Sequence, residues 1–312
     1  MNERGVALIT SIVLVAIATV LAVHIGTRAS LDLRRTSGLI SLDQGWHVAL
    51  GAEAWAIEVL RDDREDSQTD DFSEAWAQPL PPLPVDGGTM RGALEDMQGR
   101  FNVNNLVVHN SATNELKGDE RSITRFEQLL TFAGADPRWA RILADWIDTD
   151  TLPGFPEGAE DGAYLAQNPP YRAANGPVTT VSEMLSLPGM TLEEYERIRP
   201  YVAALPVGTT INVCTAAAPV LAALVEGGTD FGDVELLTSN RRDGCFPTIA
   251  DLQATLEPDV FQALQTSISE TSNWFRAVTA VRIGTSELTL YSLIERTSAG
   301  GGRTVLRSTG TE

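Results

Sequence analysis

The chain has 312 residues, of which 43% are hydrophobic, and its 42 Asp and Glu against 23 Lys and Arg give a formal net charge of −19. A charge of this sign repels nucleic-acid phosphates and attracts cations, so nucleic acid is not expected as a partner. The length allows a membrane segment followed by one large or two ordinary domains, each with a real core.

The first predicted element is a membrane-spanning helix. A charged leader at positions 2–4 precedes Gly5, and the run from Val6 to Thr27 contains no Asp, Glu, Lys or Arg. At about 1.5 Å of rise per residue this run spans roughly 33 Å, close to the thickness of a bilayer's hydrocarbon core. A secretory signal peptide would have a shorter apolar region with a cleavage site after it, whereas here the helical pattern continues past Thr27.

The residues around Gly5 carry a processing signal. Arg4-Gly5 followed by the apolar run from Val6 to Ile9 resembles the cleavage site of type IV pilins and type II secretion pseudopilins. The resemblance implies that a prepilin peptidase cuts after Gly5, that Val6 becomes the N-methylated terminus, and that the bulk of the chain lies in the periplasm. The distribution of Arg around the segment does not settle this orientation by itself. A plain single-pass anchor with an accidental Gly5 is the alternative.

The fifth residue of the mature chain departs from the usual family pattern. That position is nearly always Glu in pilins and pseudopilins, but it is Thr10 here. A carboxylate inside an apolar helix is costly unless it is paired, and in the family it is thought to pair with the terminal amine of the neighbouring subunit. The K-type minor pseudopilins, which are unusually large, are the family members that lack this Glu.

A long helix and a small sheet are expected to form a pilin-like domain. Apolar residues from Trp46 to Leu60 recur at spacings of three and four, which extends the helix to about Leu60. The acidic stretch 62–71 and the Pro-rich stretch 79–84 are expected to be exposed loops. Alternating patterns near residue 95 and at 277–283, 288–294 and 303–306 predict one antiparallel sheet packed on the helix.

The region between these strands is expected to be a helical insertion. Helical spacing occurs at 123–134, 137–147, 181–186, 192–204, 216–227 and about 252–269. Stretches 181–190 and 211–224 resemble pieces of helix-hairpin-helix units, so a membrane-anchored DNA-binding or DNA-uptake protein is the main alternative function. Between Val178 and Ala217 the basic residues are Arg197 and Arg199 against four Glu, and this balance opposes phosphate binding.

An acidic segment in the insertion is the densest group of oxygen ligands in the chain. Gly and Pro residues interrupt it, so it is predicted to form a loop that can fold carboxylates inward: Asp145, Asp148, Asp150, Glu157, Glu160 and Asp161. Ca²⁺ takes about six to eight oxygens in loose geometry, which suits such a loop better than Mg²⁺ does. The Gly and Glu positions do not fit an EF-hand. A solvated acidic loop without a metal stays open as the alternative.

Cys214 and Cys245 are the two cysteines of the chain. An even pair in an oxidising compartment favours a disulfide over two free thiols. Zinc is not expected, because His24, His47 and His109 offer no spacing of the finger or ribbon type. No Gly-x-Ser-x-Gly elbow and no phosphate-binding Gly-rich loop is present, so no catalytic residue is assigned and no enzymatic activity is expected.

Motifs along the whole chain resemble the K-type minor pseudopilins of Gram-negative type II secretion systems. Besides the leader and anchor, these are residues 99–102, the acidic loop with Pro170-Tyr171-Arg172, and Thr210-Ile211-Asn212-Val213. The resemblance implies an α+β fold: a pilin-like long N-terminal transmembrane helix on a small antiparallel sheet, with a large, mostly α-helical inserted domain. The expected division is a leader at 1–5, the helix at 6–60, the pilin-like domain at 61–106 and 273–312, and a helix-hairpin-helix or SAM-like insertion at 107–272.

The same resemblance implies a function, a cofactor and partners. The family forms the tip of the periplasmic pseudopilus and helps to initiate its assembly for export of folded exoproteins. Its insertion binds two neighbouring, structural calcium ions, for which the expected ligands are Asp148, Asp150, Glu160 and Asp161, followed by Asp145 and Glu157. Expected partners are the I- and J-type minor pseudopilins, the H-type minor and G-type major pseudopilins, and the prepilin peptidase, with the chain anchored once in the inner membrane.

Overall fold

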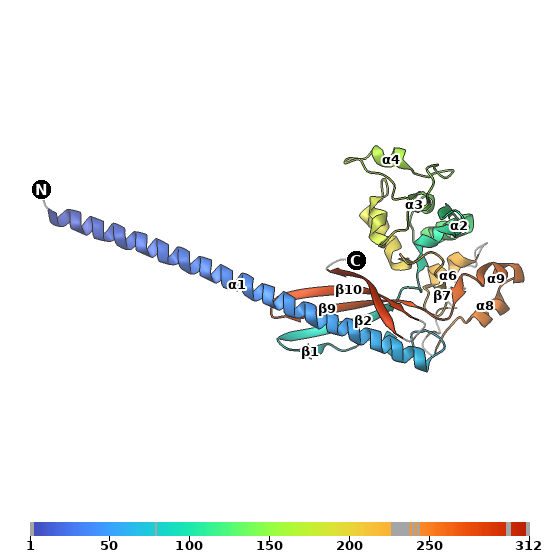
Figure 1. Cartoon of the computed structure of the whole chain (residues 1–312), viewed down its shortest axis with the longest axis horizontal. Coiled ribbons are helices and arrows are strands. Elements are labelled where there is room, and N and C mark those ends of the chain that lie inside the picture. The colour runs from blue at the N-terminus through green and yellow to red at the C-terminus, as the bar shows by residue number, and fades with distance from the viewer. Residues whose placement is uncertain are drawn as a thin grey trace.

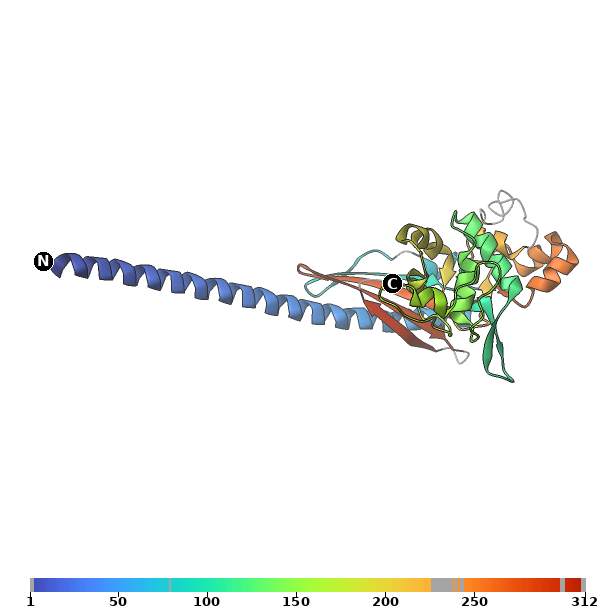
Figure 2. The ribbon, with the colours of Figure 1, turned by 90° about the horizontal axis from the view of Figure 1, so that it is seen from above.

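The computed structural model describes residues 3–78, 80–225, 238, 241, 244–297 and 301–309. A single long helix projects from a small sheet, and the remaining helices gather beyond the end of the sheet that is far from the N-terminus (Figure 1). Seen from above, the N-terminal half of the long helix again stands clear of the rest of the molecule (Figure 2). The observed architecture is the predicted pilin-like α+β fold.

Helix α1 combines the membrane segment and the amphipathic helix. It runs from Glu3 to Asp66, past the predicted end near Leu60. Within the described residues it is the one helix long and apolar enough to cross a membrane; its most apolar window has a mean hydropathy of 2.6 and no buried residue. Among the residues of α1 whose burial is described, the first buried position is Gly45, which lies against Val281 and Ile283 of the sheet. The preceding part of α1 therefore has its apolar side chains available to lipid or to other chains.

The sheet contains five antiparallel strands in the order β1-β2-β9-β10-β11. Their bounds are Leu83–Val85, Gly88–Asp96, Trp274–Ile283, Ser286–Arg296 and Gly302–Thr309. Strand β2 pairs directly with β9, with Asp96 opposite Phe275. Two neighbouring strands are thus joined by a connection of well over a hundred residues, which leaves the sheet after Asp96 and returns at Trp274. The predicted strand near residue 95 and the predicted C-terminal meander are confirmed.

One face of the sheet packs on α1 because alternate side chains of its strands point to the same side. Ala49 and Met90 pack with Val281 near one end of the contact, and Leu60 packs with Phe275 near the other. A polar contact lies between these two clusters, where the buried Glu53 accepts hydrogen bonds from Ser292 at 2.5 Å and Arg307 at 2.7 Å. Burial would raise the pKa of Glu53, but these hydrogen bonds outweigh it and its pKa is lowered.

The acidic stretch after Leu60 is not the exposed loop that was predicted. Helix α1 continues through the first half of this stretch, to Asp66. In the second half, Asp70 and Asp71 are only 1% and 4% exposed. The cause is Arg296 on β10, whose guanidinium lies 2.5 Å from Asp70 and 3.0 Å from Asp63. A buried guanidinium requires carboxylate partners. Burial and the negative charges of Glu74 and Asp70 raise the pKa of Asp63 to about 7, because together they outweigh the attraction of Arg296.

The inserted part contains most of the helices and the largest hydrophobic core. Its helices are α2 (Glu120–Phe132), α3 (Trp139–Ile147), α4 (Asp161–Leu165), η3 (Val181–Ser186), α5 (Leu192–Ile198), η4 (Arg199–Tyr201), α6 (Ala218–Leu224), α8 (Ile249–Thr255) and α9 (Pro258–Leu264). Short two-stranded pairs join β3 (Phe101–Asn102) to β6 (Val202–Ala203), β4 (Val107–Asn110) to β5 (Glu115–Gly118), and β7 (Ile211–Asn212) to β8 (Ile268–Ser269). Leu129, Leu143 and Trp139 are fully buried in this core.

Two helices predicted in this region are shorter than expected. The segment predicted at 192–204 leaves the α-helix at Ile198, because Pro200 breaks it and Val202–Ala203 pair with β3. The segment predicted at 252–269 is two helices, since Pro258 begins a second one, and it ends in strand β8. Residues 226–227 of the helix predicted at 216–227 lie outside the described residues.

The inserted part is fixed to the sheet by a buried polar junction around Asp96. Its carboxylate accepts hydrogen bonds from Thr215 at 2.6 Å, Ser272 at 2.7 Å and Asn212 at 2.9 Å. Burial raises the pKa of Asp96 despite these donors. Gly99 lies against the same site, and a side chain there would meet the Thr215 hydroxyl at 2.8 Å. Two of the motifs singled out in the sequence, 99–102 and 210–213, therefore meet at the joint between the two parts of the fold.

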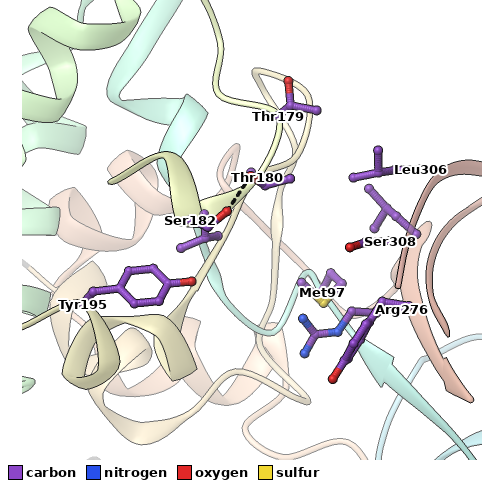
Figure 3. Close-up of a pocket in the computed structure, with 12 residues that line it drawn as sticks. Met97, Thr179, Thr180, Ser182, Tyr195, Arg276, Leu306 and Ser308 are labelled. Atoms are coloured by element: carbon purple, nitrogen blue, oxygen red, sulfur yellow. Dashed lines mark hydrogen bonds between the residues drawn. The ribbon is translucent and has the colours of Figure 1, made fainter. Parts of the chain in front are cut away.

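A small cavity of about 80 Å³ lies on the other side of this joint. Thr180, Ser182 and Tyr195 approach it from the inserted part, and Arg276 and Ser308 from the sheet (Figure 3). Thr180 and Ser182 share a hydrogen bond of 2.9 Å across its edge. The sheet and the insertion thus both line this cavity.

Candidate metal site in the inserted domain

Three carboxylates come together where helix α3 ends. Asp148 caps the C-terminal end of α3, Asp150 follows in the loop, and Glu160 immediately precedes α4. One oxygen of each lies within 4.8 Å of one oxygen of each of the others. The chain reverses between Asp150 and Glu160, and this reversal brings residues ten positions apart to one point.

Two members of this group, Asp148 and Glu160, are buried and have carboxylate oxygens without hydrogen-bond partners, whereas Asp150 is exposed. Asp148 is 6% exposed and Glu160 is 8% exposed. Asp148 Oδ1 and both carboxylate oxygens of Glu160 have no hydrogen-bond partner among the described atoms. Leaving a buried carboxylate unpaired is costly, so these atoms are arranged for a partner that is not a protein side chain. A cation is the partner that fits an all-oxygen donor set.

The electrostatics of the group agree with this interpretation. Burial and the neighbouring charges of Asp150 and Asp145 raise the pKa of Asp148 to about 7. Burial and the charges of the surrounding acids, with Asp145 first, likewise raise the pKa of Glu160 to about 7. Mutual repulsion of like charges in a desolvated site is the physical cause, and a bound divalent cation reverses it.

Asp145 lies beside the group and holds the loop closed. It is 4% exposed, and its Oδ2 accepts a hydrogen bond of 2.9 Å from the Gly154 amide. Side chains are excluded at two loop positions, since a Cβ at Gly154 would meet Asp145 Oδ1 at 2.9 Å and one at Gly158 would meet Oδ2 at 2.1 Å. Burial raises the pKa of Asp145, and the amide hydrogen bonds partly offset this. Asp145 therefore stabilises the loop by accepting a hydrogen bond from its backbone, and it is not one of the three converging carboxylates.

Asp161 and Glu157 lie outside the group of three. The Asp161 side chain is 39% exposed and lies 3.7 Å from Arg172, and its Oδ1 accepts a hydrogen bond of 3.2 Å from the Ala173 amide. Glu157 is exposed. Of the six acids singled out in the sequence, the structure thus gathers three, places Asp145 against the loop backbone, and leaves these two at the rim.

Three aromatic side chains, Trp146, Tyr164 and Tyr171, pack against one another next to the acidic loop. Tyr164 is completely buried, and its ring centroid lies 4.9 Å from that of Trp146 and 5.6 Å from that of Tyr171. Burial strongly raises the pKa of Tyr164, so this phenol stays neutral. Of these three residues, Tyr171 was noted in the sequence only as part of the motif Pro170-Tyr171-Arg172, and Trp146 and Tyr164 were not singled out. The spacing of these aromatic residues from the acids along the chain did not indicate that their rings pack beside the acidic group.

The remaining singled-out residues lie away from the acidic group. Cys214 and Cys245 form a disulfide in the structure, with their Cα atoms 4.5 Å apart. It ties the start of the α6 region to the segment before α8. Gly5 and Val6 lie within the backbone of α1. Three carboxylates that sequence reasoning did not group, Asp63, Asp70 and Glu74, also come together, and Arg296 pairs with the first two.

Comparison with known proteins identifies a family over most of the chain. Models of type II secretion system protein K match residues 99–207 and 211–271. The chain is 35% identical to the type II secretion system protein K of Pseudomonas aeruginosa over 99% of this chain and 93% of that protein. It is 33% identical to the protein of the same name from Pectobacterium carotovorum, over 94% of this chain and 92% of that protein.

A solved structure shares the fold. It is the crystal structure of the GspK–GspI–GspJ complex from the type 2 secretion system of enterotoxigenic Escherichia coli, with a TM-score of 0.78 and 25% sequence identity. The match covers 89% of this chain and all of the chain in that structure. The two segments matched by the family models begin at Gly99 and Ile211, the two motifs that meet at the Asp96 junction.

Proposed function

Because this chain belongs to the family of type II secretion system protein K and is a minor pseudopilin, we propose that it forms the tip of the periplasmic pseudopilus and helps to initiate its assembly. The observation that carries this proposal is the combination of two features in one chain. An exposed apolar helix is available for packing into a fibre, and a large inserted part occupies the opposite end of the molecule (Figure 1).

The proposed direct partners are the I- and J-type minor pseudopilins. The solved relative of similar fold is in a complex with GspI and GspJ. Helix α1 offers a contact surface for such an assembly, since Leu31, Leu39 and Ile40 lie beyond the membrane segment and are 52%, 68% and 63% exposed. The H-type minor and G-type major pseudopilins are proposed as further neighbours below the tip, and the prepilin peptidase as the processing enzyme.

Thr10 supports a position at the tip. A subunit inside the fibre has another above it, whose terminal amine needs a carboxylate partner in apolar surroundings, and the loss of that partner costs several kcal/mol. The first subunit has nothing above it, so Thr10 can replace the usual Glu without this penalty. The inserted part agrees with this position, because its bulk would obstruct a subunit stacked on top.

Immunogold labelling tests the tip position. Labelled antibody against this chain should decorate one end of the pseudopilus, Thr10→Glu should be tolerated for secretion, and overproduction of this chain alone should not give long homopolymers. Decoration along the length of the fibre would refute the tip position. Co-purification with the I- and J-type pseudopilins tests the partners separately, since the same complex could form at another place in the fibre.

We also propose that the acidic loop binds calcium as a structural ion. Asp148, Asp150 and Glu160 would provide the first ligands. The support is that one oxygen of each converges on one point, and that the buried Asp148 and Glu160 have oxygens without hydrogen-bond partners. The resemblance implies a second neighbouring ion, for which Asp161 and Glu157 at the rim are the remaining candidates. When bound, the cation neutralises the acids and fixes the loop between α3 and α4.

The proposed location is the inner membrane, crossed once by α1, with the soluble part in the periplasm and the mature chain starting at Val6. The disulfide between Cys214 and Cys245 suits that oxidising compartment. The proposed role is structural and not enzymatic, in keeping with the pseudopilin family. The DNA-binding alternative gains no support, since the family models and relatives are secretion proteins.

A further inference from the structure

The acidic loop presents two large apolar side chains to solvent. Phe155 is 88% exposed and Leu152 is 75% exposed, the largest exposed fractions among the bulky apolar residues described outside the membrane segment. Aromatic and aliphatic side chains of the same domain, such as Phe126 and Leu143, are completely buried. Single exposed apolar residues are common on protein surfaces, but two within four positions on one loop are the pattern of a contact surface.

The loop that carries them is held by specific hydrogen bonds. The Gly154 amide donates to Asp145 at 2.9 Å, the Gly158 amide donates to the Gly154 carbonyl at 2.7 Å, and the Leu152 amide donates to Asp150 at 2.7 Å. Phe155 lies within the turn closed by the two glycines. The buried face of this turn is taken by Asp145, so Phe155 is held on its outer side.

The charge around the pair is of one sign. From Ile142 to Tyr171 the chain has no Lys or Arg and has six carboxylates. Asp150 and Glu157, on either side of the apolar pair, are themselves exposed. An anionic lipid surface would be repelled by this segment, whereas a protein pocket with an apolar floor and a basic rim would complement it.

We propose that Leu152 and Phe155 insert into an apolar pocket, bounded by Lys or Arg, on another protein chain. The loop leads into α4, which lies at the outer edge of the inserted part, away from α1 and the sheet (Figure 1). A partner can therefore reach it without displacing the pilin-like part. This surface is distinct from the α1 contacts of the proposed assembly, and one chain can use both.

Photocrosslinking in cells with a complete secretion system tests the contact. Benzoylphenylalanine is placed at position 155 of the full chain, and at position 192 as a matched control, because Leu192 is also on the inserted part and is 63% exposed. We expect a discrete protein adduct from position 155 at about tenfold the yield from position 192, as for an anchor residue in a desolvated pocket. The cross-linked partner peptide should contain apolar residues beside Lys or Arg. Lipid adducts alone, no adduct, or equal yields at both positions would overturn the proposal.

Substitutions that do not disturb the core give an independent measurement. Phe155→Ser and Leu152→Ser should each lower the adduct yield from a second probe at position 153 by about tenfold, whereas Leu192→Ser should not. All variants should keep the melting temperature of the native chain and its capture of the I- and J-type pseudopilins. An adduct from position 153 that persists unchanged in Phe155→Ser would refute the apolar anchor.

Discussion

Replacing Asp148 by Asn should change the stability of the protein in opposite directions with and without calcium. In the absence of a cation, folding brings the buried carboxylates of Asp148 and Glu160 together with the exposed carboxylate of Asp150. A pKa of about 7 for Asp148, against an ordinary value of 3.8, corresponds to roughly 4 kcal/mol for charging it in the folded loop. Opening of the loop to water lowers this charging cost in the wild-type chain. We therefore expect Asp148→Asn to stabilise the chelated protein by about 1–3 kcal/mol at pH 8.

The sign of the pH dependence follows from the raised pKa values of Asp148 and Glu160. Below the unfolded pKa values both groups are protonated in both states and no penalty exists. The penalty grows as the pH rises from about 4 to about 7 and is complete above that. The chelated wild-type chain should therefore lose stability across this range, and Asp148→Asn should lose less. With calcium the order reverses, because the variant lacks a ligand.

Thermal unfolding of the full chain in detergent, followed by tryptophan fluorescence, measures this crossover. A change of 1–3 kcal/mol corresponds to about 2–10 °C in melting temperature for a protein of this size. Asp259→Asn is the matched control, since Asp259 is an exposed acid on α9 and lies outside the acidic loop. It should show no crossover at pH 8. Identical melting curves in calcium and in chelator, or a crossover in the control as large as in Asp148→Asn, would refute the three-residue ligand group.

Three further predictions concern other parts of the chain. Gly5→Val should leave the leader attached and abolish secretion, and N-terminal sequencing of active wild-type material should find Val6 first; a start at Met1 would contradict this. Mass spectrometry of non-reduced protein should recover a linked Cys214–Cys245 peptide pair, whereas two freely alkylated thiols would contradict the bridge. Arg296→Met should destabilise the chain by about 3–5 kcal/mol in chemical denaturation, because it leaves buried carboxylates at the end of α1 without their cation; a loss below about 1 kcal/mol would contradict that role.

Much of the pilin-like part could be predicted from the sequence because its signals are local. A run of 22 positions without charge before Arg28 specifies a helix that can span a membrane. Alternation along 277–283 and 288–294 specifies strands with one buried face, and the register follows from that face. The family resemblance rested on the leader and anchor, the acidic loop and short motifs at 99–102 and 210–213. The family models match the first of these motifs and residues 211–213 of the second.

The candidate site could be predicted only in part, because a cluster of acids in sequence does not say which oxygens converge. Asp148, Asp150 and Glu160 meet because the loop turns over Asp145, and the same turn directs Asp161 toward Arg172. Spacing along the chain carries no information about such a reversal.

Tertiary structure alone decided where distant charges pair. The acidic stretch after Leu60 has the composition of an exposed loop, yet Asp70 is buried because Arg296 arrives from a strand more than two hundred positions away. The sequence by itself determined that this chain has an apolar anchor, a half-buried sheet and an acidic loop, since each follows from the hydrophobic pattern of neighbouring residues. Which of its acids are buried, paired or gathered depends on long-range packing, which sets the local dielectric and supplies the partner charge.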